Sequence, residues 1–173
     1  MQISELGNNF PKNQISAECY NLDRTLIKDV NKAFDSIFLK LKMLKTLKQE
    51  NDDSYKYKKG DILKEIQASR QKLELMKIDI FSDLIEEYIE NGFNVVVFVN
   101  FVKTLEKLIE RFKTKSYITK DQSENERDEI IKDFQANKTN LIICSIKCSN
   151  IGISLHDLHG KPRVSLISPT FSS

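Results

Sequence analysis

The spacing of apolar and polar positions divides the chain into two parts. Up to about residue 93, apolar residues recur every three to four positions, which predicts helices from about Asp23 to residue 49 and from about Asp61 to Asn91. Gly92 directly after the second pattern is typical of a helix C-terminus. Residues 15–22 alternate between apolar and polar side chains, which predicts a short strand. The polar run 48–60 between the two helices predicts a mobile loop.

The pattern changes at residue 94, where short apolar runs begin to alternate with amphipathic segments. Ser123 and Glu126 form the sequence pattern of a capping box and predict a helix start. The predicted order is a strand at 95–99, a helix at 101–113, a strand at 116–119, a helix at 123–134, and strands at 141–144 and 164–168. This alternation predicts an α/β fold with three layers and a parallel sheet, preceded by an N-terminal helical extension.

Parallel sheets of this kind bind ligands at the carboxyl ends of their strands. In this chain we therefore expect the site to be built from four segments that follow strands: Asn100–Phe101, Thr119–Glu124, Ser145–Gly152 and Ser168–Ser173.

Composition narrows the class of protein without identifying it. The 173 residues are 40% hydrophobic and 30% charged, as in a soluble globular domain. No apolar run approaches the length of about 20 residues that a membrane helix needs, and no signal peptide is visible, so we expect an intracellular protein with reduced cysteines. Residues 1–94 carry 15 basic and 16 acidic groups and residues 95–173 carry 12 and 9, which permits a nucleic-acid-binding face without requiring one.

The stretch 143–160, ICSIKCSNIGISLHDLHG, offers three kinds of chemistry. His156, Asp157 and His159 lack a further ligand at the spacing of a structural metal site, so we expect no bound metal there and ordinary surface histidines instead. Cys148 lacks the base and oxyanion hole that a nucleophile requires. A phosphate loop is also absent, because the sequence Gly-Lys-Pro at 160–162 has proline where the Walker pattern has Ser or Thr.

Four segments together resemble the second RecA-like domain of superfamily 2 helicases and translocases, in particular the Swi/Snf-like branch. They are VVVFVNFVKTLEKL (95–108), DQSENERDEIIKDFQ (121–135), ICSIKCSNIGISL (143–155) and RVSLISPTFSS (163–173), which are similar to motif IV, the segment that follows it, motif V and the next strand. The run SLHDLHGKPRVSLISP is similar to helicases of large DNA viruses and phages. Ile146 occupies the position where this family usually has Thr.

The resemblance implies roles for individual residues, each of which has an ordinary surface or core role as its alternative. Gly152, Ser154 and Arg127 are implied ATP-binding residues, and the implied nucleic-acid-binding residues are Asn100, Ser145, Lys147, Cys148, Ser149 and Phe171. Small residues and hydroxyls after a strand suit sequence-independent contacts to phosphates.

The resemblance also implies an ATP-dependent nucleic-acid helicase or translocase, acting on DNA without sequence preference. ATP and Mg²⁺ would require an N-terminal RecA-like lobe, and the arginine of motif VI would follow residue 173, so we expect no ATP hydrolysis by this chain alone. The predicted division is an extension at 1–60 and an incomplete RecA-like lobe at 61–173, in the cytoplasm, nucleus, viral factory or virion. The alternatives are a non-catalytic α/β module that binds nucleic acid or protein, and an unrelated Rossmann-like enzyme such as a methyltransferase, for which a glycine-rich loop after the first strand is missing.

Overall fold

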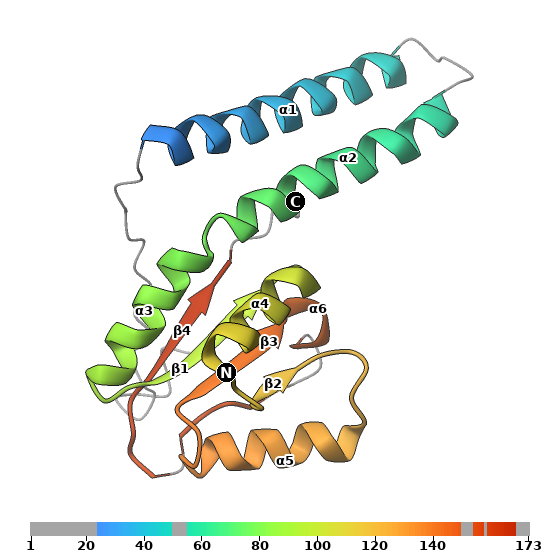
Figure 1. Ribbon diagram of the computed structural model, residues 1–173. Coiled ribbons are helices and arrows are strands. Elements are labelled where there is room, and N and C mark those ends of the chain that lie inside the picture. Colours follow the sequence, from blue (N-terminus) through green and yellow to red (C-terminus); the bar gives the residue numbers. More distant parts are fainter. Residues whose placement is uncertain (1–23, 50–54, 150–153, 158, 169–173) are drawn as a thin grey trace, which may run out of the picture.

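The fold is built around a four-stranded parallel sheet, shown in Figure 1. The structure is a computed structural model, and it describes residues 24–49, 55–149, 154–157 and 159–168. The strands are β1 (Asn94–Val99), β2 (Tyr117–Ile118), β3 (Leu141–Ser145) and β4 (Arg163–Ile167), in the spatial order β2-β3-β1-β4. All three strand pairs are parallel, as the sequence predicts.

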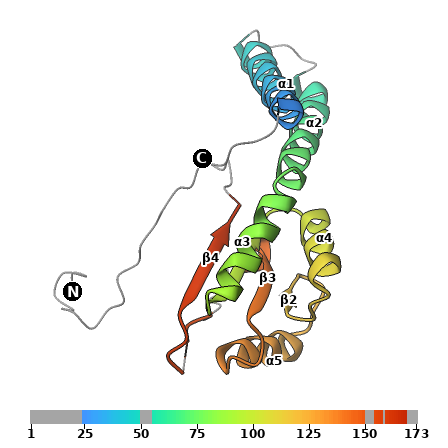
Figure 2. The same cartoon turned by 60° about the vertical axis from the view of Figure 1, so that its left-hand side comes forward.

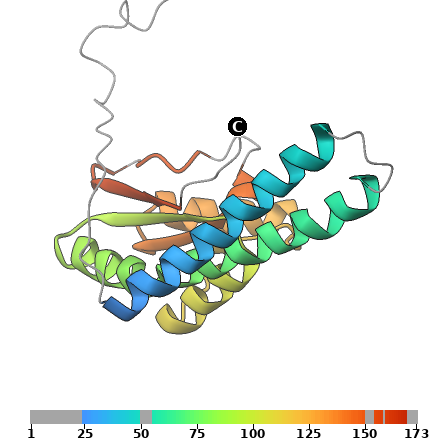
Figure 3. The same cartoon turned by 90° about the horizontal axis from the view of Figure 1, so that it is seen from above.

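Helices cover both faces of this sheet and make it a three-layer structure (Figure 3). The helices α3 (Ile78–Glu90) and α4 (Val102–Phe112) lie on one face, where Ile85 and Leu108 pack against the side chains of Val95, Val97 and Val99. The helix α5 (Glu124–Gln135) covers the other face, where Phe134 packs on Val96 and Ile142. The continuous apolar runs of β1 and β3 follow from this double coverage, because both faces of each central strand are buried.

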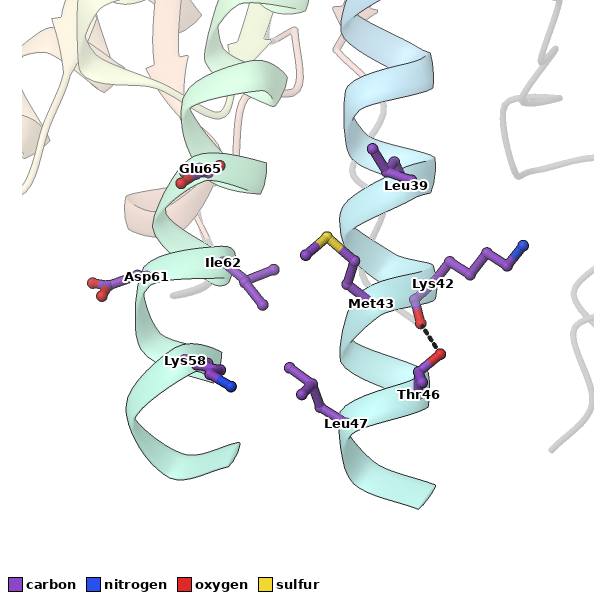
Figure 4. Close-up of a pocket in the computed structure, with 9 residues that line it drawn as sticks. All are labelled: Leu39, Lys42, Met43, Thr46, Leu47, Lys58, Asp61, Ile62 and Glu65. Atoms are coloured by element: carbon purple, nitrogen blue, oxygen red, sulfur yellow. Dashed lines mark hydrogen bonds between the residues drawn. The ribbon is translucent and has the colours of Figure 1, made fainter. Parts of the chain in front are cut away.

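A helical hairpin extends from the α/β body (Figures 1 and 2). It consists of α1 (Arg24–Gln49) and α2 (Tyr55–Leu75), which run side by side in opposite directions. An ion pair of 3.0 Å joins Lys40 of α1 to Glu65 of α2. An open groove of about 630 Å³ lies between the two helices, and Met43 and Leu47 point across it toward α2 (Figure 4). No described helix is long and apolar enough to span a lipid bilayer.

The helix boundaries differ from the sequence prediction in two places. The predicted loop 48–60 is wrong at its C-terminal end, because α2 already begins at Tyr55, whereas α1 ends at Gln49 as predicted; residues 50–54 lie outside the described part. The predicted single helix 61–91 is two helices, α2 and α3, separated by a turn at residues 76–77. In this turn the Lys77 amide donates to the carbonyl of Glu74, a tighter bond than the α-helical one. The predicted strand 15–22 lies outside the described residues.

Three other predicted features agree with the structure. The capping box of α5 is complete: the Ser123 hydroxyl accepts from the Glu126 amide and the Glu126 carboxylate accepts from the Ser123 amide. Gly92 follows the end of α3 with φ of 85°, a left-handed conformation that glycine adopts without strain. The strands of the α/β body occur within one or two residues of their predicted positions.

Candidate nucleic-acid and nucleotide site

The parallel sheet brings the carboxyl ends of its strands to one edge, which we call the carboxyl edge. Val99 at the end of β1 is paired with Ser145 at the end of β3, and Ile118 at the end of β2 is paired with Cys144. On the other side of β1, the Ser168 amide donates to the carbonyl of Phe98 at 2.9 Å. The predicted segments after β1, β2 and β4 and the first turn after β3 therefore lie along the same edge, as far as they are described.

A buried carboxylate from the hairpin holds the segment after β1. Glu74, in the last turn of α2, is only 3% exposed. Its carboxylate accepts hydrogen bonds from the amides of Asn100 (3.0 Å) and Phe101 (3.0 Å) and from the Asn100 side-chain amide (2.7 Å). The same side-chain amide donates to the Ser168 carbonyl at 3.2 Å. The Asn100 side chain, a predicted nucleic-acid contact, thus links α2, β1 and the residue after β4.

The segment after β3 turns at once into a single helical turn, α6 (Ile146–Ser149). Ser145 is buried at the end of the strand, whereas the Lys147 side chain is exposed. Cys148 is buried in the core beside Phe134 and Leu155, so its thiol faces the protein interior. Among the predicted nucleic-acid contacts in this segment, Lys147 is therefore the one whose charge faces solvent.

Arg127 lies in the first turns of α5, which begins just after β2 and so at the carboxyl edge. Its backbone amide donates to the Ser123 carbonyl at 3.2 Å. The Nε atom of its side chain is buried and has no hydrogen-bond partner among the described residues. A buried guanidinium donor without a protein acceptor is an arrangement that an anionic ligand can complete.

Ser154 lies apart from this group. Its carbonyl accepts from the side chain of Gln135, the last residue of α5, at 2.8 Å, and its hydroxyl is hydrogen-bonded to His156 Nδ1. Because α5 runs back from the carboxyl edge, this position is toward the opposite edge of the sheet. The structure therefore does not bring Ser154 together with Arg127 or Lys147. The remaining predicted residues, Gly152 and Phe171 and the side chain of Ser149, lie outside the described part.

A polar network fixes the chain between Ser154 and β4. The Arg163 guanidinium donates to the carbonyls of Leu155 (2.7 Å) and Phe134 (3.0 Å) and lies over the Phe134 ring, 4.3 Å from its centroid. Asp157 accepts from Arg163 at 3.4 Å and from the Asn137 side chain at 3.0 Å. Burial alone would raise the pKa of Asp157, but hydrogen bonds from Asn137, from the amides of residues 159 and 161 and from Arg163 lower that pKa to about 2.

This network explains the two histidines as structural neighbours of Asp157. The amide of His159 donates to the second carboxylate oxygen of Asp157 at 3.1 Å, and His156 is bonded to Ser154. Within the described ranges, no group of three or more His, Cys, Asp or Glu side chains is placed to bind a metal ion.

Sequence reasoning missed Glu74 and Arg163. Glu74 lies between two leucines in an amphipathic helix, where a charged residue usually faces solvent, and nothing in the local pattern indicates its burial. Arg163 starts an apolar strand, where an arginine is a possible signal of a buried partner. In the sequence its partner Asp157 stands between His156 and His159, a pattern that suggests a metal ligand and not an ion pair with Arg163.

Comparison with known proteins agrees with this geometry. Residues 76–159 match the family described as helicase conserved C-terminal domain, a segment that begins at the turn before α3 and includes the carboxyl-edge residues after β1, β2 and β3. The chain is also 36% identical over 169 residues to a protein of Acanthamoeba polyphaga mimivirus that is named as an ATP-dependent RNA helicase. The match covers 97% of this chain and 30% of the mimivirus protein, so the chain spans less than a third of the length of that relative. By sequence and by its RecA-like α/β fold, the chain is therefore similar to the C-terminal lobe of helicases.

Proposed function

We propose that this chain acts as the second RecA-like lobe of an ATP-dependent helicase or translocase of superfamily 2. The observation that carries the proposal is the match of residues 76–159 to the helicase C-terminal domain, on a parallel sheet whose carboxyl edge holds Lys147 and Arg127. A carboxyl edge is where open α/β sheets bind their ligands, and these two cations suit polyanionic ones.

The nucleic-acid path in this proposal follows the ends of β1 and β3. Lys147 supplies an exposed charge for a phosphate, and Ser145, Cys148 and Ser149 contribute backbone or hydroxyl groups close to it. The Asn100 side chain is already bonded to Glu74 and Ser168, so its proposed role is to fix the shape of the path as well as to border it. Phe171, which follows β4 in the sequence, is the proposed aromatic contact.

The nucleotide side of the proposal rests on Arg127. Its unpaired Nε at the carboxyl edge fits a phosphate oxygen, and Gly152 is the proposed close-approach position for ATP. Ser154 would reach the nucleotide only if residues 154–157 left the end of α5. ATP with Mg²⁺ would supply the hydrolysable phosphoanhydride. These 173 residues contain no Walker string. We therefore propose that the Walker lysine and the carboxylates that hold ATP and Mg²⁺ come from an N-terminal RecA-like lobe.

The proposed contacts are compatible with both DNA and RNA. The sequence resemblance to the Swi/Snf-like branch and to helicases of large DNA viruses favours DNA. The mimivirus relative is named as an RNA helicase, which favours RNA. Backbone contacts of the kind proposed are made without reading bases, so both polymers belong in the test.

The test is the binding of the chain to labelled single-stranded DNA, duplex DNA and RNA, followed by fluorescence anisotropy over a range of salt concentrations. We expect sequence-independent binding that weakens with salt, and we expect Lys147→Gln to reduce the slope of log K against log salt by about 0.7–0.9. Lys115→Gln is the matched control, because Lys115 is exposed just before β2 and hence at the opposite edge of the sheet. Equal slopes for the two variants would contradict the proposed path.

A further inference from the structure

Charge is unevenly distributed between the hairpin and the α/β body. The helices α1 and α2 carry 13 basic and 5 acidic side chains, whereas α3 carries five acidic and no basic ones. In the second half of α1, from Ser36 to Gln49, there are four lysines and no acidic residue. The segment 50–54 between the two helices contains three acidic residues, so the strongest positive charge belongs to α1 itself and not to the tip of the hairpin.

One side of α1 combines these lysines with exposed aromatic rings. At 3.6 residues per turn, six positions between residues 34 and 48 fall within an arc of about 120° and extend over about 21 Å. We call five of them the aromatic–lysine stripe: Phe34, Phe38, Lys42, Lys45 and Lys48; the sixth is Leu41, which is 51% exposed. Phe38 is 74% exposed and Phe34 is 45% exposed, and the three lysines are exposed as well.

The stripe is on a side of α1 that does not pack against α2. Lys42 points away from α2, whereas Met43 and Leu47 point toward it (Figure 4). Phe38 is one turn before Lys42 and therefore lies on the same side of the helix. The fourth lysine of this half, Lys40, faces α2 and is ion-paired with Glu65 at 3.0 Å.

We propose that the aromatic–lysine stripe of α1 is a second nucleic-acid contact, which binds single strands by stacking bases on Phe38 and Phe34 and by pairing phosphates with Lys42, Lys45 and Lys48. Exposed aromatic rings beside a line of cations are how proteins bind single strands without sequence preference. The length of the stripe matches about six stacked nucleotides at 3.4 Å each. This contact is separate from the carboxyl edge.

The chemistry of the stripe favours a nucleic acid over the other partners of an exposed apolar helix. Protein interfaces are depleted of lysine in their centre, and lysines make up three of the six positions in this arc. A helix that lies on a membrane separates its basic face from its aromatic face. On α1 both kinds of side chain share one side, and the opposite side packs on α2.

The experiment measures binding of the full chain to a labelled oligothymidylate of 20 nucleotides and to a DNA duplex of the same length. We expect Phe38→Ala to weaken single-strand binding about tenfold and Phe38→Leu to weaken it to the same extent, because stacking needs an aromatic ring. Phe38→Tyr should bind like the unaltered chain. The variant Lys42→Gln/Lys45→Gln/Lys48→Gln should lower the salt slope by about 2. The control Lys107→Gln/Lys115→Gln/Lys132→Gln removes the same charge from exposed positions of the α/β body and should leave the slope close to its original value.

Three results would overturn the inference. If Phe38→Leu binds the oligothymidylate like the unaltered chain while Phe38→Ala does not, the position needs only an apolar side chain and the stacking of bases on Phe38 is excluded. Equal salt slopes for the two triple variants would mean that the lysines of α1 contribute no more to binding than other exposed lysines do. Absence of any single-strand binding would also overturn it. A change of slope in Lys147→Gln without any effect of the stripe variants would leave the proposed carboxyl-edge function standing and remove only this second contact.

Discussion

At the scale of single residues, the Glu74 carboxylate is the contact that most directly ties the hairpin to the candidate site. It accepts the backbone amides of Asn100 and Phe101 and the Asn100 side chain, and it is almost fully buried. A buried carboxylate is tolerated when donors surround it, as they do here. The position of the segment after β1 therefore depends on a residue 26 positions earlier in the chain.

Removal of this carboxylate should destabilise the protein. We expect Glu74→Ala to lower the free energy of unfolding by about 3 kcal/mol, because three N–H donors lose their acceptor in a buried place. Urea denaturation followed by circular dichroism measures the change. Glu65→Ala is the matched control on the same helix, since its ion pair with Lys40 involves a largely exposed carboxylate and should contribute less than about 1 kcal/mol. Equal losses in the two variants would show that the Glu74 contacts do not stabilise the fold.

At the scale of elements, local sequence was sufficient wherever the signal is local. The capping box at Ser123, the glycine after α3 and the apolar runs of β1 and β3 each act within a few residues, and each predicted its element correctly. The break at residues 76–77 has no proline or glycine to signal it. It lies beside Glu74, whose long-range hydrogen bonds form only in the folded chain, so it could not be read from periodicity.

In the candidate site, too, the features set by topology were predictable and those set by long-range side-chain contacts were not. Parallel topology predicted that the strand ends would share one edge, and the structure confirms this. The side-chain contacts were not predictable, because Cys148 faces the core and Ser154 is hydrogen-bonded near the end of α5. These positions depend on contacts between residues that are distant in the sequence, such as Ser154 with Gln135 and Cys148 with Phe134, and no local pattern indicates them.

The Asp157–Arg163 network links Leu155 and Asp157 to the end of α5 and the start of β4, and it makes the stability of the fold depend on pH. The folded pKa of Asp157 is about 2, below the ordinary value of 3.8. A lowered pKa means that the ionised form stabilises the fold, so this contribution is complete above about pH 5 and is lost as the pH falls from 4 toward 2. We expect Asp157→Asn to be less stable than the unaltered chain at pH 7 and the difference to shrink between pH 4 and pH 2.

Urea denaturation midpoints at several pH values measure this difference. Asp128→Asn, at an exposed position of α5 outside the network, shows the effect of changing net charge by the same amount. The role of the ionised network would be contradicted if the difference in stability between Asp157→Asn and the unaltered chain stayed constant down to pH 2.

At the scale of the whole molecule, the described residues place cationic side chains at two separate surfaces. The carboxyl edge supplies Arg127 and Lys147, and the hairpin supplies a separate basic surface on α1. The 173 residues contain neither a Walker lysine string nor a described cluster of carboxylates that could hold Mg²⁺. Phosphoryl transfer depends on such groups being placed around the γ-phosphate, and two cations at one edge cannot replace them.

We therefore expect no ATP hydrolysis by the chain alone and nucleic-acid-stimulated hydrolysis when it is joined to a first RecA-like lobe with intact Walker motifs. In that two-lobed protein, Arg127→Ala should lower stimulated kcat by tenfold or more if its unpaired Nε contacts a phosphate in the transition state. Asp128→Asn, the neighbouring exposed position, is the control. Steady-state phosphate release measures kcat for Arg127→Ala and for this control. A two-lobed protein that binds nucleic acid without stimulated hydrolysis would favour the non-catalytic module, whereas full activity of Arg127→Ala would remove only the assignment of that arginine.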